Sequence, residues 1–179
     1  MANKKKTTAT EVIVSKTKEE IIKEARRIEE STLYAAKSHY NDSSMWTMFH
    51  MLLGLPTTVL SSIVAVKSFA QFDSTHNASG IIALIVAGLS GLMTFLNPNE
   101  KSAIHHKAAN SYDSLNNRAR IFRTIDCWGK DTDFVLTNKL KEFSEEQIKL
   151  NSGVQPSPLG YLRAKWGIKN GEADFEADS

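Results

Sequence analysis

The sequence predicts an all-α protein, in which a two-transmembrane helical hairpin is extended by amphipathic, coiled-coil-like helices. The first observation is the distribution of charge. No Asp, Glu, Lys or Arg occurs between Met45 and Val66, and a second uncharged run extends from Ser74 to Asn99. The second observation is that apolar residues outside these runs recur at intervals of three and four, as on one face of a helix. No segment has the alternating pattern of a strand.

The two uncharged runs have the length of membrane-spanning helices. At 1.5 Å per residue, Met45–Val66 covers roughly 33 Å and Gly80–Asn97 roughly 27 Å. A bilayer has a hydrocarbon core of about 30 Å. We therefore expect transmembrane helices over 45–67 and 80–97, joined by an external turn over 68–79. The alternative is a soluble bundle whose core helices are these runs, although such helices usually carry charge where one edge meets water.

The basic residues predict the orientation of the two spans. Lys67 is the only Lys or Arg between them, whereas nine precede the first span and twelve follow the second. Cytoplasmic flanks carry the excess of Lys and Arg, so both termini are expected in the cytoplasm. The single cysteine, Cys127, fits a reducing compartment and excludes an intramolecular disulfide.

The flanks are expected to fold into four further helices and two tails. Amphipathic helices are predicted over 16–44 and 98–126, a third helix over 130–152, a disordered polar tail over 1–15, and a short helix with an acidic tail over 153–179. In the first of these helices the predicted packing stripe is Ile21, Ala25, Ile28, Thr32, Ala35 and His39. In the second it is Ile104, Ala108, Ser111 and Leu115, then either Ala119 or Phe122, and finally Ile125. In the third it is Leu136, Leu140, Phe143, Gln147 and Leu150.

Each predicted span has one face of small or polar residues. Such faces let helix backbones approach closely, and their hydroxyls can bond across the contact. The candidate pore or packing face of the first span is His50, Gly54, Thr57, Ser61 and Ala65, and the candidate packing face of the second is Gly80, Ala83, Ala87 and Gly91. The simpler interpretation is that the two faces only pack the spans against each other.

Two prolines are candidate hinges. Pro56 removes a backbone donor within the first span and should kink that helix. Pro98, with Asn97 before it and Glu100 after it, is typical of a helix that restarts. Residues 41–44, Asn-Asp-Ser-Ser, either bend the chain or cap the membrane helix.

Nothing in the sequence predicts an enzyme, a cofactor or a metal. Gly88 and Gly91 lie in an apolar run without the Lys that a phosphate-binding loop needs. His105 and His106 are adjacent, so on a helix they point in different directions and cannot readily share a metal. Basic residues alternate with acidic ones, so we expect no direct DNA binding.

Several short motifs, taken in order, resemble the SLATT family (SMODS and SLOG-associating two-transmembrane effectors). They cover most of the chain, from about Ile21 to Phe175. The motifs are Glu24–Arg26, Tyr34–Lys37, the span exit Phe95–Lys101, Ala108–Tyr112, Leu115–Arg118, Ala164–Ile168 and Gly171–Ala173.

The resemblance implies a bacterial anti-phage effector that oligomerises in the inner membrane and permeabilises it, causing abortive infection. A separate protein would supply the trigger: a nucleotidyltransferase making a cyclic oligonucleotide, a nucleotide sensor or a reverse transcriptase. Direct binding of a nucleotide to this chain stays open. A non-conducting two-span anchor for a cytoplasmic partner is the alternative. The candidate trigger or partner surface comprises Arg118, Arg120, Arg123, Tyr161, Arg163, Lys165 and Trp166, although the first three could instead form salt bridges across the hairpin.

Overall fold

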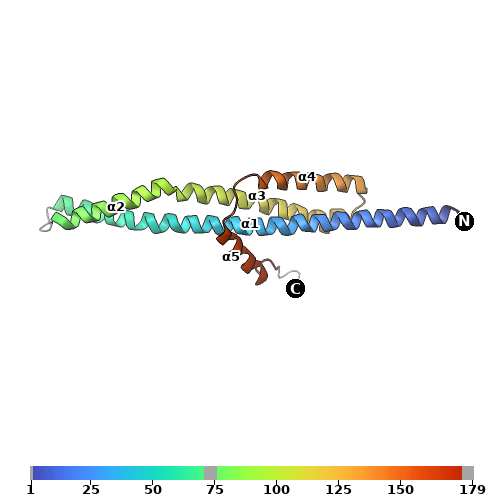
Figure 1. Cartoon of the computed structure of the whole chain (residues 1–179), viewed down its shortest axis with the longest axis horizontal. Coiled ribbons are helices and arrows are strands. Elements are labelled where there is room, and N and C mark those ends of the chain that lie inside the picture. The colour runs from blue at the N-terminus through green and yellow to red at the C-terminus, as the bar shows by residue number, and fades with distance from the viewer. Residues whose placement is uncertain (1, 71–75, 175–179) are drawn as a thin grey trace. The chain divides into compact units, whose positions relative to one another are not determined.

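The computed structural model describes residues 2–70 and 76–174, with side chains over 16–67 and 79–174. This part of the chain is all-α, as the sequence predicts, and contains no strand (Figure 1). Its elements are α1 (Ala2–Ala70), α2 (His76–Leu96), α3 (Pro98–Thr124), the short 3-10 helix η1 (Asp126–Trp128), α4 (Asp133–Asn151) and α5 (Pro158–Lys169).

The chain divides into two compact units. We call Met1–Asn41 together with His106–Ser179 the charged unit, and Asp42–His105 the apolar unit. Helices α1 and α3 each contribute to both units, whereas α2 belongs to the apolar unit and α4 and α5 belong to the charged unit. The division follows the charge pattern of the sequence, because the two uncharged runs are both in the apolar unit.

The helix boundaries refine the predicted ones. Helix α1 continues through residues 41–44, so these residues do not end a helix. Helix α2 begins at His76, four residues before the predicted start, and residues 71–75 of the predicted turn lie outside the described residues. The predicted restart at Pro98 is confirmed, because α3 begins there after Asn97, whose φ of 42° interrupts the helix. Asn adopts this left-handed conformation more readily than most residues.

The N-terminal segment differs from the expectation. The sequence predicted a disordered polar tail over 1–15, but α1 begins at Ala2. The segment contains neither Gly nor Pro, so nothing in it stops a helix that propagates from the packed part of α1. The side chains before Lys16 and residues 175–179 of the predicted acidic tail lie outside the described residues.

The core of the charged unit lies where α1, α3, η1 and α4 meet. Phe122, Cys127 and Leu136 are fully buried there against Ile21 and Ala25 of α1. A second cluster contains Ile28, Leu115 and Ala119, with Leu140, Phe143 and Leu150 of α4 packed against it. The apolar stripes predicted for the first flanking helix and for the third helix are therefore the faces that pack. Burial raises the pKa of the Cys127 thiol, so this residue behaves as a core side chain.

Polar contacts also join α1 to α3 in the charged unit. The Arg123 guanidinium donates to both carboxylate oxygens of Glu29, at 2.6 and 3.2 Å, and this bond raises the pKa of Arg123. Asn116 Nδ2 donates to the Glu29 carbonyl at 2.5 Å, beside the buried Thr32. A two-point arginine–carboxylate pair also fixes geometry, so these contacts set the register of the two helices.

Local caps define where α4 and α5 begin. Thr132 accepts a bond from Val135 N at the start of α4, and Ser157 accepts one from Gly160 N at the start of α5. Pro158 occupies the first turn of α5, where its missing N–H is not needed. Helix α5 then lies on α1, with Asn41 Nδ2 donating to the Gly160 carbonyl at 3.3 Å and the Tyr34 and Tyr161 rings 6.3 Å apart.

Candidate functional site

The most unusual feature of the apolar unit is the amount of large apolar surface that it exposes. Leu84 is 75% exposed and Phe95 is 87% exposed. Two helices, Lys16–Lys67 and Ser79–Trp128, are long and apolar enough to cross a membrane by length and composition, and no residue in the most apolar stretch of either one is buried within the structure. The most exposed large side chains are Met48, Met51, Leu52, Leu55, Val59, Val66, Ile81, Leu84 and Phe95.

The predicted polar face of the first span is divided between the inside and the outside of the hairpin. His50, Gly54 and Thr57 are half-buried, and a Cβ added at Gly54 would lie 3.5 Å from Met93 Cε of α2. Ser61 and Ala65 are exposed, and Leu60 and Val64 are half-buried on the inner side in their place. At 3.6 residues per turn, each step of four residues turns the face by about 40°. Residues 57, 61 and 65 therefore turn progressively away from the contact between α1 and α2.

Four hydroxyl groups in the uncharged run of α1 bond within their own helix. Thr57 Oγ1 donates to the Leu53 carbonyl at 2.6 Å, and Ser61 Oγ to the Thr57 carbonyl at 2.7 Å. Thr58 and Ser62 do the same on the neighbouring positions. This pattern satisfies the protons of all four hydroxyls in an apolar environment. The buried Nδ1 of His50, by contrast, has no hydrogen-bond partner among the described residues.

The small-residue face of α2 does not pack against α1. Large side chains form that contact instead, because the half-buried positions of α2 are Ile82, Val86, Leu89, Met93 and Leu96. Gly80, Ala83, Ala87 and Gly91 are all exposed, and a Cβ built at Gly80 or Gly91 meets no atom within 4 Å. The interpretation that this face only joins the two spans is therefore wrong for α2, and the face is open to another helix.

The two candidate hinges have different surroundings. Helix α1 continues through Pro56, which is exposed. Pro98 is buried at the first turn of α3, directly after Asn97. Asn97 N donates to the Met93 carbonyl at 3.0 Å and Lys101 N donates to the Asn97 carbonyl at 3.2 Å, so the backbone bonding bridges the break.

A buried polar cluster joins α1 to α3 inside the apolar unit, and the sequence did not predict it. Ser102 Oγ lies 3.1 Å from Ser43 Oγ and 2.8 Å from Thr47 Oγ1. One turn away, His105 Nδ1 lies 3.8 Å from the fully buried Asp42 Oδ2. Asp42 and His105 are 63 positions apart in the chain, so no local spacing indicates the pair.

Arginines of the predicted trigger surface take part in interactions within the charged unit. Arg118 pairs with Glu146 of α4 and lies over the Phe143 ring, and Arg123 pairs with Glu29. Arg120 donates to Asn117 Oδ1 at 3.4 Å. The contacts of Arg118 and Arg123 match the alternative in which the arginines hold the helices together, whereas the Arg120 bond lies within α3.

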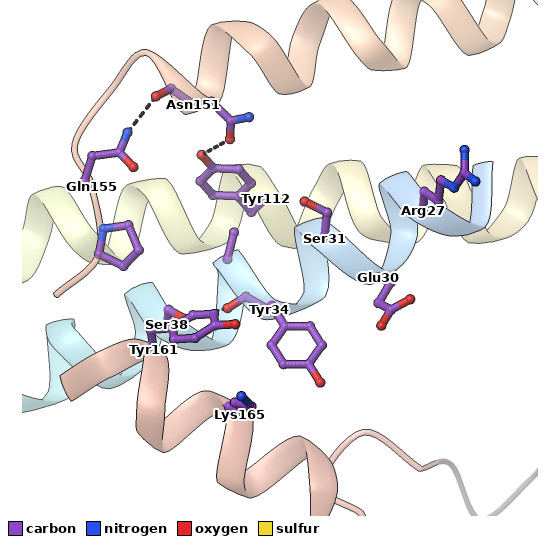
Figure 2. A pocket seen from close by; sticks show the side chains of 12 residues that line it. Arg27, Glu30, Ser31, Tyr34, Ser38, Tyr112, Asn151, Gln155, Tyr161 and Lys165 are labelled. Carbon is purple, nitrogen blue, oxygen red and sulfur yellow. Dashed lines mark hydrogen bonds between the residues drawn. The ribbon is translucent and has the colours of Figure 1, made fainter. Parts of the chain in front are cut away.

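Tyr161 and Lys165 instead line a groove in the charged unit (Figure 2). The groove has a volume of about 560 Å³ and lies between α1, α3, α5 and the segment joining α4 to α5. Tyr112 donates to Asn151 Oδ1 at 2.9 Å on one wall, and burial raises the pKa of Tyr112, so the phenol keeps its proton. The lining residues are Arg27, Glu30, Ser31, Tyr34, Ala35, Ser38, Tyr112, Asn151, Gln155, Pro156, Tyr161 and Lys165.

The chemistry that the groove offers is binding. It has aromatic rings, amides and two cations, opposed by the single carboxylate of Glu30. Arg163 and Trp166 of the predicted surface are exposed on α5 and are not part of the lining. Among the residues that the structure describes, no three His, Cys, Asp or Glu side chains are grouped to hold a metal.

Comparison with known proteins gives no relative: no family model, no curated protein and no solved structure matches this chain.

Proposed function

We propose that this chain is a bacterial inner-membrane effector of anti-phage defence, with two spans and both termini in the cytoplasm. In this proposal it oligomerises and permeabilises the membrane when a separate sensor signals infection, and the cell stops growing. The charged unit is the cytoplasmic part that receives the signal. The motifs that resemble the SLATT family, from Glu24–Arg26 to Gly171–Ala173, are the basis for the defence role.

The membrane assignment is carried by one observation: no residue in the most apolar stretch of either long helix is buried within the structure. Soluble monomers rarely expose contiguous apolar patches of more than a few hundred Å², and each Å² left in water costs about 25 cal/mol. A bilayer removes this cost for all outward side chains at once. The lack of charge over Met45–Val66 and the excess of Lys and Arg outside the spans support the same placement.

The hydroxyls of Thr57 and Ser61 are the proposed lining of the leak. In the resting state the helix satisfies them internally, and after triggering they turn toward water. Changing both residues to Leu is expected to abolish depolarisation of cells that overexpress the protein, because a leucine face cannot hold water. Membrane potential and growth are the measurements, and the protein left in an alkali-washed membrane pellet reports insertion.

Thr58 and Ser62 provide the matched control. They have the same hydroxyls, bonded to the helix in the same way, on the neighbouring positions. The Thr58→Leu, Ser62→Leu protein should still depolarise cells. Equal depolarisation by both double variants would remove Thr57 and Ser61 from the leak path.

The exposed small face of α2 is the proposed contact between protomers. Replacing Gly91 by Leu fills the space into which another helix would pack, and overpacking of this kind costs about 1–3 kcal/mol. We expect association to weaken by roughly five- to 150-fold, measured by cross-linking and by mass determination in detergent. Leu92→Phe adds bulk beside this face and should leave association unchanged. Native-like association of the Gly91→Leu protein would contradict the assignment.

The second candidate function is a non-conducting anchor that recruits a cytoplasmic partner. The groove around Tyr34, Tyr112 and Tyr161 favours it, since a docking site needs no channel. Overexpression distinguishes the two functions. An embedded protein that leaves growth and membrane potential unchanged would support the anchor and count against the leak.

A further inference from the structure

Helix α5 carries two different stripes. The small residues Gly160, Ala164 and Gly167 are its buried positions. On another side of the helix, Leu159, Leu162 and Trp166 follow at intervals of three and four, and these side chains are 66%, 60% and 69% exposed. Residues at such intervals are neighbours on one helix face, so α5 presents an apolar stripe away from its contact with α1.

The charged residues within α5 itself are all positive. Pro158–Lys169 contains Arg163, Lys165 and Lys169 and no acidic residue. At 3.6 residues per turn, Arg163 flanks the stripe on one side, and Lys165 and Lys169 flank it on the other. A short helix with Leu and Trp on one face and basic residues beside them is typical of a segment that lies in a membrane interface.

The attachment of α5 to α1 lies close to the first uncharged run. Asn41 Nδ2 donates a hydrogen bond to the Gly160 carbonyl at 3.3 Å. Asn41 precedes Met45 by four residues, which is about 6 Å of helix. The headgroup layer on each side of a bilayer is roughly 5–7 Å thick. The start of α5 is therefore tied to the part of α1 that would lie among lipid headgroups.

We propose that α5 lies on the cytoplasmic surface of the bilayer, with Leu159, Leu162 and Trp166 in the interface and its basic residues on anionic headgroups. This inference rests on the proposed two-span placement. The occupant of the stripe is lipid, because lipid supplies both an apolar layer for the three large side chains and negative charge for the flanking cations. The contacts of Gly160 with Asn41 and of Tyr161 with Tyr34 keep α5 on α1 while the apolar stripe is in lipid.

The test uses the full chain with single cysteines, each labelled with an environment-sensitive fluorophore. Cys127→Ser removes the native thiol, and Leu162→Cys, Ile148→Cys and Leu84→Cys place the probe on α5, α4 and α2. Ile148 is the matched surface control, because it is 66% exposed in the charged unit. Proteoliposomes of phosphatidylcholine, with or without phosphatidylglycerol, carry lipids with a spin-label quencher near the headgroup or deeper in the chains.

We expect the Leu162 probe to lose most of its fluorescence to the shallow quencher, more strongly with phosphatidylglycerol present, and the Leu84 probe to be quenched by the deep one. The Ile148 probe should keep its fluorescence. Arg163→Glu together with Lys169→Glu should remove the quenching at Leu162 and leave Leu84 unaffected.

Three results would overturn the proposal in distinguishable ways. An unquenched Leu162 probe beside a quenched Leu84 probe would reject the surface role of α5 and leave the two spans intact. A blue-shifted Leu162 probe that lipids do not quench would mean that protein, such as a second copy of the chain, covers the stripe. An unquenched Leu84 probe would reject the two membrane spans. The proposed contact of α5 with lipid, which rests on those spans, would be rejected together with them.

Discussion

Replacing Leu84 by Arg is expected to prevent stable insertion of α2 into the membrane. Leu84 lies close to the midpoint of α2 and points away from the rest of the protein. Near the centre of a spanning helix, Arg costs about 2.5–3.5 kcal/mol, whereas Leu contributes about 0.3–0.6 kcal/mol favourably. The change therefore costs about 3–4 kcal/mol, or roughly 100- to 1,000-fold in the insertion equilibrium. The measurement is the fraction of protein retained in the alkali-washed membrane pellet.

The same substitution separates the membrane interpretation from the soluble one. In a soluble protein, an exposed leucine can usually be changed with less than about 0.5 kcal/mol of effect. Ile148→Arg on α4 is the matched control, since Ile148 is also exposed but belongs to the charged unit. It should leave retention in the pellet unchanged. If Leu84→Arg behaved like Ile148→Arg, the two-span assignment would be wrong.

Features that depend on local spacing could be predicted from the sequence. The uncharged runs, the restart at Pro98 and the stripe beginning at Ile21 all follow from composition and period, and the structure has them. The stripe of α3 was predicted only in part. Leu115, Ala119 and Phe122 are buried as expected, but Ile104 and Ile125 are exposed.

The first half of α3 packs through polar side chains. Ser102, His105 and Tyr112 are buried there together with the small Ala109, and a search for apolar residues at helical spacing would not select these polar side chains. Their partners lie on α1: Ser102 meets Ser43, and the Tyr112 ring stacks on His39 at 5.5 Å. Such contacts lower the cost of burial only after the helices have paired. The sequence alone therefore favoured the wrong face.

The same limit applies to the candidate site. The sequence identified the small residues of α2 and the polar residues of α1, but it could not assign their neighbours. Large side chains such as Leu89 and Met93 occupy the contact with α1 and leave Gly91 open. The groove lined by Tyr112 and Tyr161 joins segments far apart in the chain. Only Tyr161 and Lys165 of that lining could be selected beforehand, from their place in a short amphipathic segment.

Replacing Phe122 by Ala is expected to unfold the charged unit while leaving membrane insertion intact. Phe122 is 1% exposed, and its ring meets Phe143 of α4 edge-on at 5.4 Å. Removing a buried phenylalanine costs about 3–5 kcal/mol, a large share of the roughly 5–15 kcal/mol that stabilises a typical folded protein. Protease digestion of detergent-solubilised protein, followed over temperature, measures the loss.

Phe134→Ala is the control for this change, because it removes the same side chain from a position that is 74% exposed. Its protease resistance should equal that of the unchanged protein. The Phe122→Ala protein should still remain in the washed membrane pellet, since the exposed apolar stretches belong to the other unit. In the proposed function it would also fail to respond to a trigger, because the helices that receive the signal would no longer hold their register. Equal protease resistance of the two variants would mean that Phe122 does not support the core in which the structure places it.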